Sequence, residues 1–301
     1  MKSVAADTAP APLTAGSATR LGDFVALTKP RLNALVVATT AAGYYLGAPG
    51  GPDVGPMLVA VAGTTLVAAG SAVLNQVYER DTDGLMRRTR LRPLPDRRLG
   101  IPEATVYGAV LSAVGLGLLA FGSNALAASI AAATLLIYIA VYTPMKRRSA
   151  MATLVGAVPG ALPPLIGWAA ALGSVSAGGW SLFAIVFLWQ IPHFMAIAWL
   201  YREDYGQAGF PMLPVIEPDG ARTGRQAVAY SAALIPTTLV PTLARVSGHA
   251  YYAIAMVLGL ALLWLAIRFH RERTERAARL LFFGSIIYLP LLWLAMIVNH
   301  T

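Results

Sequence analysis

Three oxygen-bearing side chains recur at helical spacing in the segment 75–95, NQVYERDTDGLMRRTRLRPLP. Asn75, Glu79 and Asp83 are each four residues apart, so on a helix they lie along one face. Carboxylate and amide oxygens suit Mg²⁺, which keeps part of its water shell and commonly shares its coordination with a substrate phosphate. The spacing therefore predicts a site for a hard divalent cation.

Four arginines follow at once, namely Arg87, Arg88, Arg90 and Arg92. A guanidinium group matches phosphate geometry with paired hydrogen bonds. A simpler interpretation is that a helix leaving a membrane becomes charged and that its arginines set the topology. Because the three acceptor residues stand directly beside this positive charge, we favour a metal-diphosphate site at a membrane surface.

The composition excludes an ordinary soluble domain, since 57% of the 301 residues are hydrophobic and 12% are charged, with a mean hydropathy of +0.62. A helix needs about 20 apolar residues to cross the hydrocarbon core. Nine runs qualify: 32–48, 57–77, 105–121, 125–142, 154–172, 180–201, 227–243, 250–267 and 280–298. We predict an all-α polytopic membrane protein, with a bundle of nine transmembrane helices formed by residues 24–301.

Basic residues fall almost entirely on one side of these runs. Of the 23 lysines and arginines, only Arg245 lies on the other side. By the positive-inside rule the basic side is the cytoplasm. We therefore expect a multi-pass protein of the cell membrane with a cytoplasmic N-terminus and an outside C-terminus. The metal-diphosphate site, at the end of the second run, then faces the cytoplasm.

The net charge of +9 is explained by this topology and by anionic ligands or lipids. Nucleic acid is not an expected partner, because no basic array with interleaved aromatic residues accompanies the charge. The absence of cysteine excludes disulfides and thiolate catalysis. Residues 1–23 are rich in Ala, Pro, Thr and Ser and have no apolar core of signal-peptide length, so we expect a flexible cytoplasmic tail.

Two further pairs of polar residues stand near the predicted membrane surface. Lys29 and Arg31 open the first run, where they can anchor the helix in the headgroups or face an anionic substrate. Tyr142 and Lys146 are four residues apart, so a phenol and an ammonium can reach one ligand together. They can equally be an aromatic-belt tyrosine and a snorkelling lysine. Both questions stay open at the level of sequence.

The sixth run carries His193 within the membrane, and Asp204 follows eleven residues later. This separation is close to three helical turns, so we expect both side chains on one face. An intramembrane histidine faces the protein interior or a cavity by default, as a hydrogen-bonded structural residue or as a ligand contact. Asp204 reaches the same membrane side as Asp83. Two carboxylate clusters there could clamp a diphosphate through more than one Mg²⁺.

Taken together, these motifs resemble the UbiA-type intramembrane prenyltransferases. The resemblance covers residues 24 to 298 and rests on N-x3-E-x3-D-x2-M-x-R-T-x2-R-P-L at 75–94, on the Tyr-x3-Lys pair, and on WQIPHF at 189–194 with DY-x2-AGFPMLP at 204–214. The RT-x2-RPL and WQIPHF stretches point to the branch that farnesylates heme. The resemblance implies nine helices, in agreement with the charge-based count.

Two positions depart from the superfamily pattern. Glu79 stands where the superfamily usually has aspartate, which keeps the charge and lengthens the reach. His193 stands near a position where an aspartate is usual, so metal binding by the second motif rests on Asp204. A histidine facing the cavity would suit a heme, as an iron ligand or a propionate contact.

The resemblance implies farnesyl diphosphate and heme b as substrates and heme O as product. Diphosphate departs from an allylic cation, a heme vinyl group attacks that cation, and water then adds. The implied ligands of Mg²⁺, which also count as catalytic residues, are Asn75, Glu79, Asp83 and Asp204. The other implied catalytic and substrate-binding residues are Tyr142, Lys146, Arg88, Arg92, Lys29, Arg31, Arg202 and His193.

Two alternatives remain. Within the class, the acceptor could be a quinone precursor or another aromatic compound. From a different class, the chain could be a membrane transporter, although transporters usually show internal repeats and midplane charge, whereas the polar residues here gather at one face. Membrane lipids are expected partners, as is a downstream heme-modifying enzyme or terminal oxidase assembly.

Overall fold

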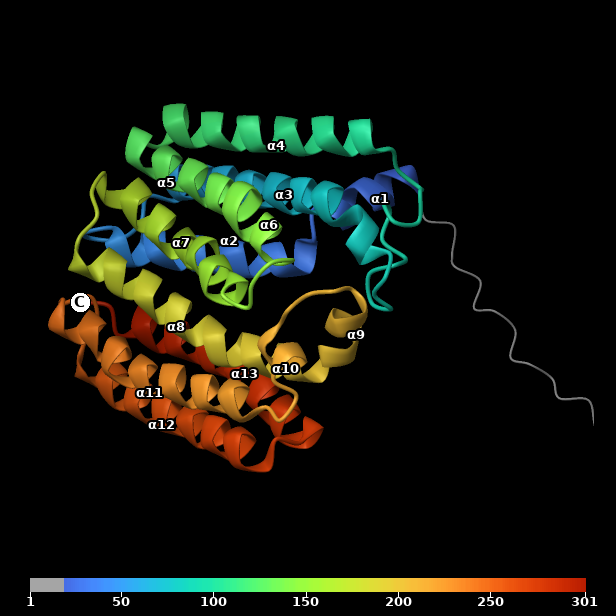
Figure 1. Cartoon of the computed structure of the whole chain (residues 1–301). Helices are drawn as coiled ribbons and strands as arrows, with labels where there is room; N and C mark the ends of the chain where they lie inside the picture. The colour runs from blue at the N-terminus through green and yellow to red at the C-terminus, as the bar shows by residue number, and fades with distance from the viewer. Residues whose placement is uncertain (1–18) are drawn as a thin grey trace, which may run out of the picture.

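The computed structural model describes residues 19–301, which contain helices and no strand. Figure 1 shows the long helices lying side by side, with α3 and α4 at one side of the bundle, α11 and α12 at the other, and α2 and α7 between them. The helices are α1 (Arg20–Leu27), α2 (Pro30–Gly47), α3 (Val54–Asp83), α4 (Ile101–Gly122), α5 (Ala125–Leu136), the π-helix η1 (Ile137–Tyr142), α6 (Thr143–Met145), α7 (Ala152–Leu172), α8 (Ala177–Leu200), α9 (Arg202–Gln207), α10 (Leu213–Ile216), α11 (Ala221–Leu243), α12 (His249–Glu272) and α13 (Glu275–Val298).

Seven of the helices in the described range are long and apolar enough to cross a membrane. They are α3, α4, the continuous segment Ala125–Met145, α7, α8, α12 and α13. Large apolar side chains on their outer surface, such as Phe121 at 95% exposure and Trp264 at 60%, would contact lipid. The chain is a multi-pass membrane protein.

The other two predicted crossings coincide with α2 and α11, which are not among these seven helices. Polar residues lower the hydropathy of both. Arg31 and Asn33 lie in the first turn of α2, while α11 carries Arg222 and Arg225 in its first two turns and Pro236 and Pro241 farther along. Of the nine predicted membrane crossings, seven therefore correspond to helices that are long and apolar enough to span a membrane.

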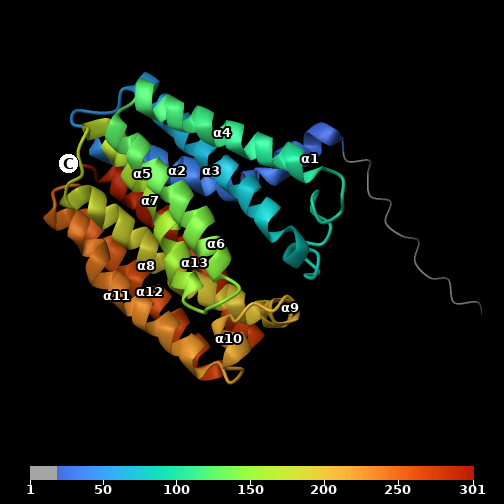
Figure 2. The same ribbon diagram turned by 45° about the horizontal axis from the view of Figure 1, so that its top comes forward.

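The first helix begins inside the segment 1–23 that was expected to be a tail. Residues 1–18 of that segment lie outside the described range, but Arg20–Leu27 form α1. The Thr19 hydroxyl caps α1 by accepting a hydrogen bond from the Gly22 N–H at 3.2 Å. Asp23 is buried and forms an ion pair with Arg98 in the loop after α3. Helix α1 is thus attached to the end of the bundle where α3 ends (Figure 2).

Close backbone contact holds α2 against α7, at the centre of the bundle. A Cβ added to Gly43 would lie 2.1 Å from the Pro164 carbonyl oxygen, and one added to Gly167 would lie 2.1 Å from the Thr40 carbonyl oxygen. Small residues permit such contact between helices in a membrane, where packing rather than water exclusion drives association. These contacts fix the two helices that form one wall of the cavity described below.

We expect Gly167→Ala to lower the stability of the folded protein, because the new methyl group meets main-chain atoms of α2 that cannot move independently. Overpacking of this kind typically costs about 1–3 kcal/mol. Gly117→Ala in α4 is the matched control, since its Cβ would have no atom within 4 Å. Thermal unfolding in detergent measures both variants. Equal melting temperatures would contradict the proposed contact.

Candidate active site

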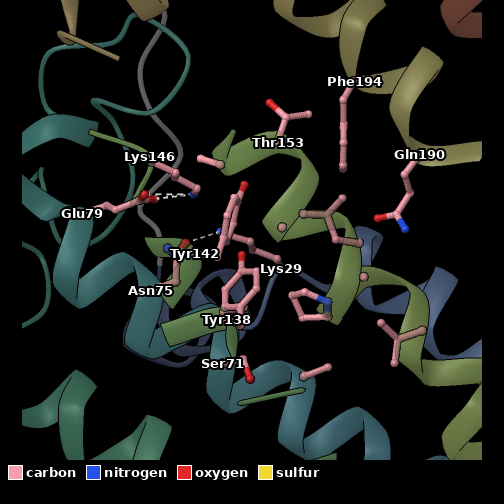
Figure 3. Close-up of a pocket in the computed structure, with 18 of the residues that line it drawn as sticks. Lys29, Ser71, Asn75, Glu79, Tyr138, Tyr142, Lys146, Thr153, Gln190 and Phe194 are labelled. Atoms are coloured by element: carbon pink, nitrogen blue, oxygen red, sulfur yellow. Dashed lines mark hydrogen bonds and ion pairs between the residues drawn. The ribbon is translucent and has the colours of Figure 1, made fainter. Parts of the chain in front are cut away.

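A cavity of about 440 Å³ opens among α2, α3, η1, α7 and α8. Its walls inside the membrane are largely apolar and include Val36, Val67, Pro163 and Ile166. Near its mouth lie polar and charged side chains, several of which Figure 3 shows converging from different helices. The cavity can therefore accept an apolar chain that carries a charged head.

The α3 residues Asn75, Glu79 and Asp83 all line this cavity. Each side chain is strongly buried, since the residues are 1%, 8% and 1% exposed. They share one face because α3 remains helical from Val54 to Asp83, beyond the end of its apolar run. The structure thus brings together the three acceptor residues that the spacing placed on one face.

Each of these acceptors contacts a basic residue from another segment. The Lys146 ammonium lies 2.9 Å from Glu79 Oε1 and donates a hydrogen bond to Oε2 at 3.1 Å. Arg92 donates from Nη1 to Asp83 Oδ2 at 2.8 Å. Lys29 Nζ lies 3.4 Å from Asn75 Oδ1, which is a long hydrogen bond (Figure 3). Cations and acceptors therefore alternate around the mouth.

The two lysines at the mouth have opposite pKa shifts. Burial, and then the positive charges of Arg92 and Lys146, lowers the pKa of Lys29 to about 7. Burial alone would lower the pKa of Lys146, but Tyr142 and Glu79 more than offset it, and the pKa of Lys146 lies above its usual value. An anionic ligand bound between the lysines would favour the charged form of both.

The residues present fit a hard divalent cation. Glu79 Oε1 is buried and forms an ion pair with Lys146 Nζ at 2.9 Å, but a carboxylate has about four lone-pair sites and this contact does not use them all. This oxygen retains coordination capacity, as does the weakly bonded Oδ1 of Asn75. Within residues 19–301, no three His, Cys, Asp or Glu side chains gather closely enough to hold an ion by themselves. Amide and phosphate oxygens would have to complete the coordination, which is usual for Mg²⁺.

Asp204 does not lie on the helix that carries His193. Helix α8 ends at Leu200, Tyr201 leaves the helical conformation with φ −112° and ψ 22°, and Asp204 lies on the separate helix α9. The prediction that His193 and Asp204 share one helical face is therefore wrong. Asp204 does not line the cavity, but its neighbour Tyr205 does, and the Tyr205 hydroxyl accepts a hydrogen bond from Arg88 at 2.9 Å. A metal-binding role for Asp204 stays a prediction.

His193 points away from the cavity, toward α13. Its Nδ1 lies 2.8 Å from Ser285 Oγ, and its ring stacks on Trp189 and Phe282 with centroids 5.2 and 5.0 Å away. The Ser285 hydroxyl donates to the Phe282 carbonyl at 2.7 Å, so Nδ1 carries the hydrogen that it shares with Ser285. This packing favours the structural interpretation of His193, and Phe194 is the neighbour that lines the cavity.

The remaining predicted residues divide into two groups. Arg88, Arg92, Tyr142, Lys146 and Lys29 line the cavity. Arg31 and Arg202 do not: Arg31 is exposed, and Arg202 donates to the Trp199 carbonyl at 2.8 Å and stacks over the Trp199 ring.

Sequence reasoning missed part of the lining. Tyr138, Gln190 and Thr153 all face the cavity, and Figure 3 shows them on three different helices. Tyr138 precedes Tyr142 by four residues, so its helical spacing could have identified it. Gln190 is an amide within an apolar run, and a polar side chain in such a run is expected to face the protein interior or a cavity.

The sequence model of the UbiA prenyltransferase family matches residues 36–288. A protoheme IX farnesyltransferase from Solibacter usitatus (strain Ellin6076) is 46% identical, over 92% of this chain and 98% of that protein. The structure of a digeranylgeranylglyceryl phosphate synthase superposes with a TM-score of 0.79 at 18% identity, covering 93% of this chain and 98% of that one. A UbiA homologue from Archaeoglobus fulgidus bound to GPP and Mg²⁺ gives 0.65 at 16% identity, covering 91% and 99%. The chain belongs to the UbiA prenyltransferase family.

Proposed function

We propose that this protein transfers the farnesyl group of farnesyl diphosphate to a vinyl group of heme b, giving heme O. The observation that carries the proposal is the cavity, which joins apolar walls to a mouth where Asn75, Glu79 and Asp83 alternate with Lys29, Lys146 and Arg92. The choice of heme as acceptor is supported by the Solibacter usitatus relative, whose name is protoheme IX farnesyltransferase.

In this proposal the isoprenoid chain occupies the apolar part of the cavity and the diphosphate lies at the mouth. Lys146 and Arg92 bind phosphate oxygens there, with support from Lys29 and Arg88. Asn75, Glu79 and Asp83 would hold Mg²⁺, which supplies Lewis-acid stabilisation of the negative charge on the leaving diphosphate.

The chemistry begins when the allylic C–O bond breaks and its electron pair leaves with the diphosphate. The basic residues at the mouth stabilise this developing charge, as the donors of an oxyanion hole do. The faces of Tyr138 and Tyr142, which line the cavity with centroids 5.3 Å apart, shield the allylic cation from water. The vinyl π electrons of heme b then form the new C–C bond. Water adds to the resulting cation and loses a proton to give the hydroxyethylfarnesyl group.

Asp204 is kept in the proposal as a ligand for a second Mg²⁺. Its support is its position beside Tyr205, which lines the cavity and accepts a hydrogen bond from Arg88. Farther along the same segment, Phe210 packs against Met86. We expect Asp204→Asn to lower turnover without changing the folded state. Wild-type turnover in this variant would remove Asp204 from the site.

We also propose nine membrane crossings in the cell membrane, a cytoplasmic N-terminus, an outside C-terminus and an active site facing the cytoplasm. In support, α1, the end of α3, α6 and α9 lie at one end of the bundle, while the C-terminus lies at the other (Figure 1). Twenty-two of the 23 basic residues belong to that first side in the predicted topology.

Purified protein in lipid nanodiscs, given farnesyl diphosphate and Mg²⁺ with either heme b or 4-hydroxybenzoate, tests the proposed acceptor. We expect heme O to form and 4-hydroxybenzoate to remain unmodified, as followed by mass spectrometry. Prenylation of 4-hydroxybenzoate alone would favour the quinone-type alternative. A transferase should release diphosphate only when an acceptor is present, whereas a transporter should release none.

His193→Ala is expected to leave heme affinity and the absorption spectrum of bound heme unchanged, because the ring faces Ser285 rather than the cavity. Loss of its hydrogen bond and ring packing should lower stability by about 1–3 kcal/mol. Phe194→Ala is the matched control, since that ring does line the cavity. A heme spectrum altered by His193→Ala would restore the histidine to the acceptor site.

A further inference from the structure

Thr143 is a fully buried hydroxyl that lies between the cavity wall and Asn75. It is 1% exposed and stands where the π-helix η1 ends and α6 begins. Its Oγ1 lies 3.1 Å from Asn75 Nδ2 and 2.7 Å from the carbonyl oxygen of Tyr138. Within residues 19–301 these are the two hydrogen bonds of this hydroxyl, so its two neighbours determine what it does.

The π-helix accounts for the position of Thr143. The Thr143 N–H bonds to the Tyr138 carbonyl, five residues back instead of four, and the Thr143 hydroxyl bonds to the same carbonyl. Pro144 follows immediately and has no N–H to donate to the preceding turn. At the end of this wider turn the Thr143 hydroxyl therefore reaches Asn75 of α3 as well as the Tyr138 carbonyl of its own helix.

The Thr143 hydroxyl has one hydrogen, which fixes the orientation of the Asn75 amide. A carbonyl oxygen can only accept, so the hydroxyl must donate its hydrogen to Tyr138. It can then only accept from Asn75, which must present its NH₂ group. The Asn75 Oδ1 is left facing Lys29 Nζ at 3.4 Å, on the cavity side with Glu79.

We infer that Thr143 is a positioning residue, which holds the Asn75 amide with its oxygen toward the cation site. This inference rests on the proposed function only in assuming that Asn75 binds a divalent cation, and it does not depend on the acceptor. Reversal of the amide would present NH₂ to the cation, and a positively polarised group cannot serve as its ligand. Outer-shell partners of metal ligands commonly act in this way.

A purely structural role makes a different prediction. If the hydrogen bond only joins η1 to α3, its loss should lower stability and leave cation affinity unchanged. If it orients the amide, its loss should weaken cation binding even in a protein that stays folded. The decisive measurement is therefore binding of a cation, without turnover.

The experiment measures Mn²⁺ binding by electron paramagnetic resonance, in the presence of a non-hydrolysable thiolo analogue of farnesyl diphosphate. We expect Thr143→Val to weaken Mn²⁺ binding roughly 10- to 100-fold, the usual effect of losing an outer-shell partner. Thr143→Ser should bind like the unmodified protein. Thr134→Val is the matched control, because Thr134 lines the same cavity but donates only to the Ile130 carbonyl of its own helix, at 2.8 Å.

Asn75→Asp provides a second and sharper test. A carboxylate has two equivalent oxygens, so either of its orientations presents an oxygen to the cation. Adding Thr143→Val to Asn75→Asp should therefore change Mn²⁺ affinity less than about twofold, against the 10-fold or greater loss expected in the Asn75 background. Thermal unfolding of all four proteins, with Mn²⁺ affinity compared at a temperature where each is folded, separates a loss of affinity from a loss of stability.

Two outcomes would overturn the inference while leaving the proposed function intact: unchanged Mn²⁺ affinity in a folded Thr143→Val protein, or equal losses in the Asn75 and Asn75→Asp backgrounds. Failure of the unmodified protein to bind Mn²⁺ with the analogue would overturn both the inference and the metal site. Mn²⁺ binding that follows the expected pattern without heme farnesylation would support the inference and reject the proposed acceptor.

Discussion

Replacing Asp83 with asparagine is expected to lower the turnover number for heme O formation roughly 10³-fold, the scale of losing a principal electrostatic stabiliser of a transition state. The change keeps the shape of the side chain and removes one of the two carboxylates at the mouth. Asp83 is 1% exposed and its Oδ2 lies 2.8 Å from Arg92 Nη1, so the carboxylate is held in place in the cavity wall. Product formation at saturating farnesyl diphosphate and heme b, over a range of Mg²⁺ concentrations, measures the effect.

The fold should survive this substitution. Arg92, the partner of Asp83 at 2.8 Å, has a side chain that is 31% exposed and can turn to solvent. Asp81→Asn is the matched control on the same helix, because that side chain is 83% exposed and pairs only with its neighbour Arg80. Substantial turnover by Asp83→Asn, or an equal loss in Asp81→Asn, would remove the carboxylate face of α3 from the mechanism.

The all-helical fold and one face of the site could be predicted from local patterns. Apolar runs long enough to cross a bilayer identify the membrane helices, because no other use of such a run is stable in water. The four-residue spacing of Asn75, Glu79 and Asp83 places these side chains on one face if the helix continues to Asp83. Helix α3 does continue to Asp83. In both cases the information lies within one helix.

The position of Asp204 could not be predicted, because it depends on where α8 ends. Spacing arithmetic from His193 assumed an unbroken helix, but the chain leaves the helical conformation at Tyr201 and starts again at Arg202. No glycine or proline marks this break. Tertiary contacts of the next segment, including the packing of Phe210 against Met86, accompany the change of direction.

The ion pairs and the π-helix also lie beyond sequence patterns. Glu79 and Lys146 are 67 residues apart, and only the packing of η1 against α3 brings them together. Hydrogen bonds of the π type in η1 leave the apolar pattern of the run unchanged. The role inferred for Thr143 therefore required atomic positions, whereas the choice of Asn75 did not.

Lys146→Met should have two separable effects, because Lys146 both neutralises Glu79 and faces the diphosphate site. Methionine keeps an unbranched chain and removes the charge, so turnover should fall roughly 10²- to 10³-fold. Stability should fall by about 3–5 kcal/mol, since Glu79 is left as an unpaired charge at 8% exposure. Single-turnover kinetics and thermal unfolding measure the two effects independently.

A double variant, Glu79→Gln with Lys146→Met, separates these effects. It leaves no unpaired charge at this position, so stability should return toward that of the unmodified protein, because a buried pair contributes little net stability compared with the cost of breaking it. Turnover should stay low, because neither the carboxylate nor the ammonium is restored. Recovery of turnover together with stability would mean that Lys146 acts only through the fold, and that Arg92, Lys29 and Arg88 suffice to neutralise the leaving diphosphate.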